Sequence, residues 1–219
     1  TAIPSGASAY EIEQSLRFND NDSAYLSKTF ASAGNRKTWT FSCWIKRGNI
    51  GSTQILFGTG TPATGTSFGG MYLDGAKNSV YIYDPGNGCA KLTTAVLRDL
   101  SAWYHVMGVM DATNTVARIY INGEEITDFR SGEAVNPSNA NGNCNAATAH
   151  SVGRNGNGNG EPFDGYMAEV HFIDGTALTP SSFGETGDYG EWKPIEVSGL
   201  TYGTNGFYLP FKQDYTVEG

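Results

Sequence analysis

The stretch WYHVMGVMDATNTVARIYING, residues 103–123, decides the fold class of this chain. Its first eight residues are apolar on both faces, which is typical of a strand in the centre of a sheet. Polar and apolar residues then alternate over 117–121, as in a half-buried strand. Asn122-Gly123 is the most favoured pair for a type I′ turn. We therefore expect two long strands followed by a hairpin whose partner strand covers 125–129.

Shorter segments of the same kind surround this stretch. Period-2 alternation over 38–46 places Phe41, Cys43 and Ile45 on one face. Asp74-Gly75 predicts a two-residue hairpin turn, and 131–160 reads as an Asn/Gly/Ala-rich loop. A single helical turn is expected at 179–182, with Thr179 as N-cap and Pro180 at the first helical position. Further strands are predicted at 15–18, 24–26, 54–57, 70–73, 79–83, 163–173 and 206–209, the last at a sheet edge because Pro210 lacks an N–H.

These segments, together with the composition, predict an all-β chain. Gly accounts for 29 of 219 residues, aromatic residues for 12% and charged residues for 16%, which suits many short strands joined by tight turns. Such strands must bury one face against a second sheet. We expect a two-sheet antiparallel jelly-roll sandwich with at most one short helical turn. Residues 1–15 are expected to form an arm or linker and 16–219 one domain, with its core at 16–185 and a C-terminal extension and closing strand at 186–212.

Charge and hydropathy exclude some partners. The net charge of −8 argues against nucleic acid, which is bound through Lys and Arg clusters. The sequence contains no run of 18 apolar residues, so no membrane insertion is expected. The N-terminus has no signal-peptide pattern. The chain starts without Met and ends without a natural stop, which suggests a fragment or a processed product.

The three cysteines form no metal-binding pattern. Cys43 lies in an apolar strand, where we expect it to pack as a small hydrophobic residue. Cys89 and Cys144 lie in Gly/Asn-rich segments, and whether they pair is left open.

The order of several motifs resembles a known family. A Trp-Tyr-His-Val strand at 103–106 precedes a Tyr-Ile-Asn-Gly hairpin at 120–123, and Phe-Asp-Gly follows at 163–165. This order, over roughly Leu16 to Glu185, resembles the laminin-G-like, concanavalin-A-like jelly-roll superfamily. The stretches that carry the resemblance are SLRFNDNDSAYL (15–26), TWTFSCWIKR (38–47), DLSAWYHVMGVMDATNTVARIYINGEEI (99–126), HSVGR (150–154) and FDGYMAEVHFIDGTALTPSSFGE (163–185).

A narrower resemblance concerns modules of tailed-bacteriophage virion proteins, especially those of marine and cyanobacterial phages. It is carried by SAGNRKTWTFSCWIKR (32–47), DGTALTPSSFGE (174–185) and TYGTNGFYLPF (201–211). The resemblance implies a non-enzymatic structural module of a tail fibre, spike or capsid appendage, located in the virion. It further implies attachment to host-surface glycans or virion assembly, with other virion subunits as partners, and a homo-oligomer or a place in a larger assembly.

Sugar binding in related folds uses aromatic rings with Asn and Asp hydrogen bonds, on loops or on a concave sheet face. The resemblance therefore makes a glycan site the leading functional hypothesis, although the tyrosines also suit ordinary sheet positions and the Asn/Gly loop an ordinary connection. The candidate ligand-binding residues are Tyr72, Tyr81, Tyr83, Asn155, Asn157 and Trp192.

A calcium site is the second hypothesis. The turn Asn19-Asp20-Asn21-Asp22 is rich in oxygen, which hard cations prefer, and makes Asp20 and Asp22 candidate ligands. The competing interpretation is an Asx-rich turn. Relatives often carry an acidic residue where this chain has Ala168, and that departure argues against an inherited metal site. No other cofactor is expected.

The alternative to a structural module is a glycan-active enzyme or a calcium-dependent lectin on the same sandwich. Catalysis is thus the third hypothesis. Glycosidases need two carboxylates on either side of the sugar bond. Glu169 and Asp174 are five residues apart on one predicted strand and should point to opposite faces. His105 lies between apolar neighbours and is expected to be a hydrogen-bonded structural residue. We therefore expect no enzymatic activity.

Overall fold

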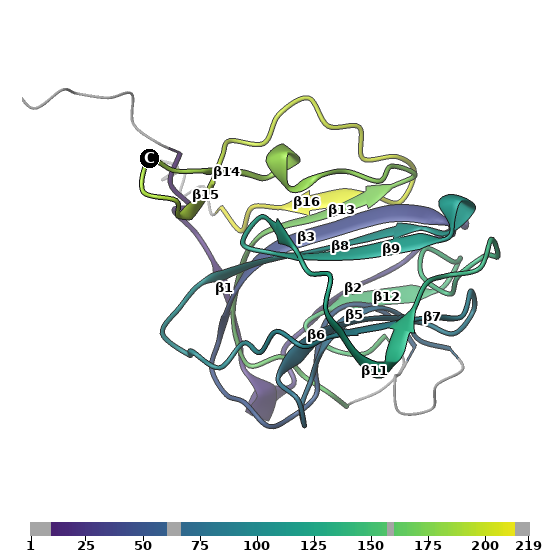
Figure 1. The fold of residues 1–219 in the computed structure, drawn as a ribbon, viewed down its shortest axis with the longest axis horizontal. Helices are drawn as coiled ribbons and strands as arrows, with labels where there is room; N and C mark the ends of the chain where they lie inside the picture. Colours follow the sequence, from purple (N-terminus) through teal and green to yellow (C-terminus); the bar gives the residue numbers. More distant parts are fainter. Residues whose placement is uncertain (1–9, 61–66, 157–159, 213–219) are drawn as a thin grey trace, which may run out of the picture.

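The computed structural model describes residues 10–60, 67–156 and 160–212, which form two antiparallel seven-stranded sheets stacked face to face (Figure 1). The first sheet has the order β1 (Leu16–Phe18), β13 (Gly165–Asp174), β3 (Thr38–Arg47), β8 (Tyr104–Asp111), β9 (Val116–Ile121) and β10 (Glu124–Glu125), with β16 (Phe207–Leu209) also paired to β13. The second sheet has the order β11 (Phe129–Val135), β7 (Cys89–Thr93), β6 (Ser79–Asp84), β5 (Gly69–Asp74), β4 (Gln54–Thr59), β12 (Ala149–Val152) and β2 (Leu26–Thr29). The two-stranded sheet of β14 (Gly184–Thr186) and β15 (Trp192–Pro194) lies apart from them, and the one-turn 3-10 helices are η1 (Asp20–Asp22), η3 (Ala112–Asn114) and η4 (Pro180–Ser182).

The main core fills the space between the two sheets. As the period-2 pattern predicts, Phe41, Cys43 and Ile45 are completely buried there. Phe57 of the second sheet meets Phe41 and Phe172 of the first, with ring centroids 5.0 and 4.6 Å apart. Because each strand sends alternate side chains inward, these rings interdigitate and fix the two layers.

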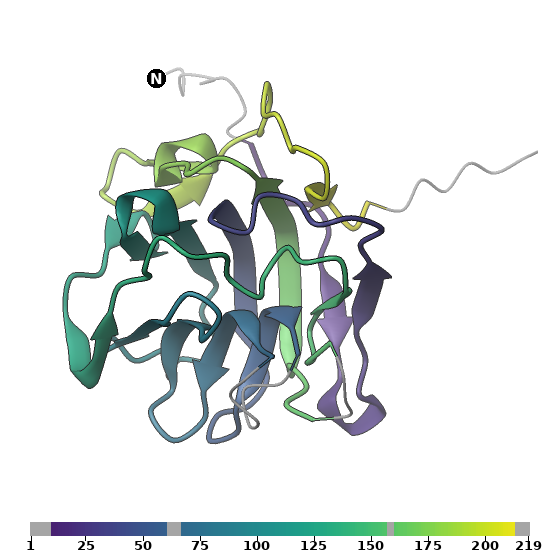
Figure 2. The same cartoon turned by 90° about the vertical axis from the view of Figure 1, so that its right-hand side faces the viewer.

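The outer face of the first sheet is also buried, because the C-terminal segment 175–205 lies across it. Met107, Val109 and Ile173 point outward from the sheet and pack against Phe183. Figure 2 shows this segment, coloured green to yellow, along the top of the molecule on the side of the first sheet. This cover explains why the strand over 103–110 is apolar on both faces.

The structure confirms the all-β class and its central strands. The segments predicted from 38–46 and 103–121 are β3, β8 and β9, which pair with one another in the middle of the first sheet. Asn122 and Gly123 both have positive φ, 50° and 81°, as a type I′ turn requires. β16 lies at a sheet edge and ends before Pro210.

Several predicted elements were wrong in extent. The strand after Asn122-Gly123 has only two residues, and Phe129 instead begins β11 of the second sheet. Asp74-Gly75 opens a four-residue connection with Asn78 at φ 55°, not a two-residue turn. The segment 131–160, which was predicted to be a loop, contains most of β11 and all of β12. Thr179 precedes a 3-10 turn with Pro180 first, but its side chain makes no capping bond.

The cysteines are buried thiols. Cys43, Cys89 and Cys144 are all free thiols. Cys89 begins β7 and does not lie in a turn. In the described part of the chain, no helix is long and apolar enough to cross a membrane.

Candidate functional site

Three candidate tyrosines lie together on the outer face of the second sheet. Tyr72 stands directly opposite Tyr81 on the neighbouring strand, and their ring centroids are 5.0 Å apart. Tyr83 follows two residues later on the same face as Tyr81, at 5.5 Å. The residues between them point into the core, so strand alternation alone produces this row.

Phe68 and Glu133 complete the row, and we call the five residues the tyrosine face: Phe68, Tyr72, Tyr81, Tyr83 and Glu133. The Phe68 ring stands edge-on to Tyr72 at 5.5 Å and lies parallel to Tyr83 at 6.4 Å. Gly58 makes room for it, because a Cβ there would lie 3.1 Å from the Phe68 ring. The rings thus fix one another in a rigid aromatic surface.

Hydroxyl groups and one carboxylate supply polarity to the tyrosine face. Burial raises the pKa of Tyr72 and Tyr81 above its usual value, and Tyr81 also donates a hydrogen bond to Glu133. Both phenols therefore remain protonated donors at neutral pH. Glu133 Oε2 is buried without a hydrogen-bond partner among the described residues. Such an atom is an exception to the rule that buried polar atoms are hydrogen-bonded.

Exposure differs along the row. Tyr72 and Tyr81 are only 7% and 9% exposed, whereas Tyr83 is half-buried. Tyr83 is therefore the most accessible of the three rings. Aromatic rings beside a few fixed polar groups are the usual composition of a small-molecule site.

The remaining glycan candidates are not assembled with the tyrosines as one site. Asn155 lies in the loop after β12, where its Nδ2 donates to Glu161 Oε2 at 3.1 Å and its buried Oδ1 has no partner in the described residues. Trp192 belongs to the cover of the first sheet and stacks on His105 at 5.8 Å. It is therefore on the opposite side of the sandwich from the tyrosine face, and its role in ligand binding stays a prediction. Asn157 lies outside the described residues.

Sequence reasoning missed Phe68 and Glu133. Glu133 belongs to β11, which pairs with β7 through an irregular register between Phe129 and Ala134. Its neighbours Ser131 and Gly132 give no alternating pattern, so no local signal marked this segment as a strand. The apolar Phe68 stands alone before two glycines and offered no periodicity.

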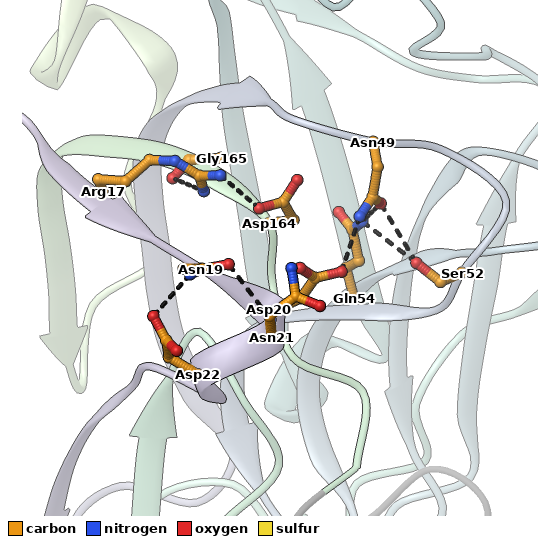
Figure 3. A network of polar contacts seen from close by, with 10 residues as sticks. All are labelled: Arg17, Asn19, Asp20, Asn21, Asp22, Asn49, Ser52, Gln54, Asp164 and Gly165. Atoms are coloured by element: carbon orange, nitrogen blue, oxygen red, sulfur yellow. Dashed lines mark hydrogen bonds and ion pairs between the residues drawn. The ribbon is translucent and has the colours of Figure 1, made fainter.

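The turn proposed for calcium is closed by its own hydrogen bonds (Figure 3). Asn19 accepts from the Asn21 N–H at 3.2 Å and donates through Nδ2 to Asp22 Oδ2 at 2.6 Å. The Asp20 carboxylate accepts from Asn49 Nδ2 at 2.9 Å. The described residues contain no group of three or more His, Cys, Asp or Glu side chains arranged to hold a metal ion. The geometry is that of an Asx-rich turn.

We predict that chelation does not destabilise the domain. Because Asp20 and Asp22 bind neighbouring amides, excess chelator should leave the melting temperature unchanged, and added calcium should not raise it. Differential scanning fluorimetry with and without chelator measures this. A calcium-dependent rise that is absent from Asp20→Asn would contradict the prediction.

Titratable groups also cluster beneath the C-terminal cover. His105 Nε2 lies 2.8 Å from Ser42 Oγ, which agrees with the expected structural role of this histidine. Glu169 Oε2 accepts from the Tyr208 hydroxyl at 2.7 Å and lies 3.7 Å from His171 Nε2. All of these side chains except Tyr208 are buried.

The side chains of Glu169 and Asp174 lie in different environments, as their spacing on the strand predicts. Glu169 has φ 47° at a bulge in β13 and contacts His171 on the outer face of the sheet. Asp174 ends the strand and binds the loop residues Asn35, Asn145 and Asn205. The two carboxylates therefore do not flank a common space.

The two stacked antiparallel sheets define a jelly-roll β-sandwich. The chain belongs to the Concanavalin A-like lectin/glucanases superfamily, whose family model matches residues 18–182. No curated protein sequence matches the chain.

Solved structures with similar folds include carbohydrate-related proteins. A candidate carbohydrate-binding protein of Bacteroides ovatus has a TM-score of 0.54 and 22% identity over 72% of this chain and 42% of its own. NanB, a sialidase of Streptococcus pneumoniae, has a TM-score of 0.51 and 16% identity over 79% of this chain and 28% of its own. Domains LG4-5 of the mouse laminin α1 chain have a TM-score of 0.47 and 11% identity, covering 85% of this chain and 47% of theirs. The chain thus spans less than half the length of each, and these similarities concern the fold alone.

Proposed function

We propose that this domain is a non-enzymatic carbohydrate-binding module that holds a glycan on the tyrosine face. The observation that carries the proposal is the row of Tyr72, Tyr81 and Tyr83 in mutual ring contact beside Glu133 Oε2, which has no hydrogen-bond partner among the described residues. A sugar presents C–H groups to an aromatic ring and hydroxyl groups to phenols and carboxylates. Both kinds of partner are supplied by this one surface.

The non-enzymatic part of the proposal is supported by the placement of the carboxylates. Glu169 lies beneath the C-terminal cover, and Asp174 is engaged by three loop residues. A glycosidase mechanism needs two carboxylates on either side of one bond. Detection of polysaccharide cleavage that disappears with Glu169→Gln would overturn this part.

The biological setting that we propose is a virion, with the module in a tail fibre, spike or capsid appendage of a tailed bacteriophage. The resemblance of 32–47, 174–185 and 201–211 to phage modules is the support for this placement. There the module attaches the particle to surface glycans of the host, next to other virion subunits or further copies of itself.

We predict that Tyr83→Ala lowers glycan affinity about tenfold, because one exposed aromatic contact is worth about 1.4 kcal/mol. The measurement is a glycan array followed by calorimetry with the strongest binder. Tyr189→Ala is the matched control, since Tyr189 is 97% exposed and lies outside the tyrosine face. It should bind like the unmodified domain.

Two results would contradict the glycan site. Equal losses in Tyr83→Ala and Tyr189→Ala would show that the effect is not specific to the tyrosine face. Absence of binding to any sugar at millimolar concentration would instead favour a role in virion assembly.

A further inference from the structure

An apolar slot of about 340 Å³ opens at one edge of the sandwich. It lies between β2 and β12 of the second sheet and β16 of the first. Its apolar walls are Leu26, Phe30, Phe57, Val152, Phe207 and Leu209. It is separate from the tyrosine face, because its apolar wall residues belong to or pack against the core between the sheets.

The slot exists because the two edge strands do not close over it. Among the described residues, β2 pairs only with β12, and the three-residue strand β16 pairs only with β13. Leu26, Phe207 and Leu209 consequently remain half-buried, although Phe30 and Phe57 behind them are buried. Half-buried apolar walls around a concave space are surface that an apolar ligand would remove from water.

One positive charge stands at the mouth of the slot. Lys28 and Leu26 share the inward-facing side of β2, since they pair with His150 and Val152, which both lie on the core side of β12. Lys28 is exposed, and no carboxylate among the described residues forms an ion pair with it. The slot therefore combines an apolar interior with a free ammonium group at its entrance.

His150 adds an uncharged wall. Its ring stacks on Phe30 at 4.3 Å, and both nitrogens are occupied, by Thr148 O at 3.0 Å and by the Asn145 N–H at 2.9 Å. Burial lowers its pKa to about 4. At neutral pH the imidazole carries no charge, so Lys28 is the one charged side chain among the described residues that line the slot.

We propose that this slot binds a long-chain carboxylate, with the aliphatic chain between the sheets and the carboxylate at Lys28. The volume lies within the range of small-ligand sites, about 300–1,000 Å³. The charge favours an anionic head group over a neutral one. The proposal does not depend on glycan binding at the tyrosine face.

The test uses cis-parinaric acid, a fluorescent long-chain carboxylate, as the probe. The unmodified domain should give a saturable rise in fluorescence at micromolar concentration, and laurate should displace the probe more strongly than lauryl alcohol. Lys28→Gln should weaken laurate binding about threefold, as expected for an exposed ion pair, and leave lauryl alcohol unaffected. The matched control is Lys77→Gln, which removes an exposed lysine at the β5–β6 turn and should change neither ligand.

A variant that fills the slot tests the aliphatic part. Leu26→Trp should abolish binding of both ligands while far-UV circular dichroism and the melting temperature show a folded domain. Tyr83→Ala should leave probe binding intact, so a failure of this proposal is distinguishable from a failure of the glycan proposal.

Four outcomes would overturn the proposal: no saturable binding to the unmodified domain, unchanged binding in Leu26→Trp, equal laurate affinity in Lys28→Gln, or a dimer in sedimentation that excludes the probe. In the last case a second copy of the chain, not a lipid acid, occupies the slot.

Discussion

Replacing Asp174 with alanine is expected to lower the free energy of unfolding by about 4 kcal/mol, because one buried carboxylate satisfies three donors from separate loops. Its Oδ1 accepts from the Asn35 N–H at 2.7 Å and from Asn145 Nδ2 at 2.6 Å. Its Oδ2 accepts from the Asn205 N–H at 3.1 Å. Alanine would remove the acceptor of two buried donors, the Asn205 N–H and one hydrogen of Asn145 Nδ2, and that of the Asn35 N–H nearer the surface.

These loops are the connections that hold the end of the sandwich together. Asn145 follows β11, Asn205 precedes β16, and Asn35 precedes β3. Asn145 also accepts from Asn205 Nδ2 at 2.8 Å and donates to Asn35 O at 3.1 Å. Loss of the central carboxylate therefore weakens contacts between both sheets and the C-terminal segment, not one local bond.

Urea unfolding of Asp174→Ala, with Asp111→Ala as the matched control, measures this effect. Asp111 also ends a strand of the first sheet, but its side chain is partly exposed and caps the short turn η3. Its replacement should cost about 1 kcal/mol, the usual value of a capping residue. If the two variants lost equal stability, the buried network would contribute no more than an ordinary cap.

This network also shows where sequence reasoning ends. β3 and β9 were predictable because their side chains alternate, and β8 because it is apolar on both faces; Asn122-Gly123 marks the turn after β9. Asn145 lies in an Asn/Gly-rich segment that looks like a loop, and its role depends on partners 29 to 110 residues away. Such pairing leaves no periodic trace in the sequence.

The candidate site was predictable to the same partial extent. Tyr81 and Tyr83 are two residues apart on a predicted strand, so alternation places them on one face. Glu133 could not be added, because its strand reads as polar and irregular. The position of Trp192 could not be predicted, because only the path of the C-terminal segment decides which sheet it covers.

Acid is expected to destabilise the domain by about 3 kcal/mol between pH 7 and pH 4, chiefly because burial strongly lowers the pKa of two of its three buried histidines. Burial lowers the pKa of His105 to about 3 and that of His150 to about 4. In the unfolded chain both titrate near their ordinary value of about 6.5. Below pH 6.5 the unfolded state binds protons at these histidines and the folded state does not. The free energy of unfolding therefore decreases as the pH falls below that value.

Each histidine contributes about 3 kcal/mol over this interval, from about 1.4 kcal/mol per unit of pKa shift. Asp84 opposes them. Burial raises its pKa to about 6, against the hydrogen bonds from Asn143, Cys144 and Gly86 that favour its charge. The folded state therefore takes up a proton on Asp84 before the unfolded state does, and this offsets about 3 kcal/mol of the loss.

His105→Gln separates these contributions. An amide does not titrate, so the variant should lose the His105 part of the pH dependence and show little net change in unfolding free energy between pH 7 and pH 4. The measurement is the slope of that free energy against pH, which does not depend on any constant stability lost with the Ser42 contact. Tyr189→Ala, which removes an exposed side chain and leaves His105 in place, should keep the full slope. An unchanged slope in His105→Gln would mean that the acid sensitivity arises elsewhere, and the neutral burial of His105 beneath the C-terminal cover would then contribute nothing to it.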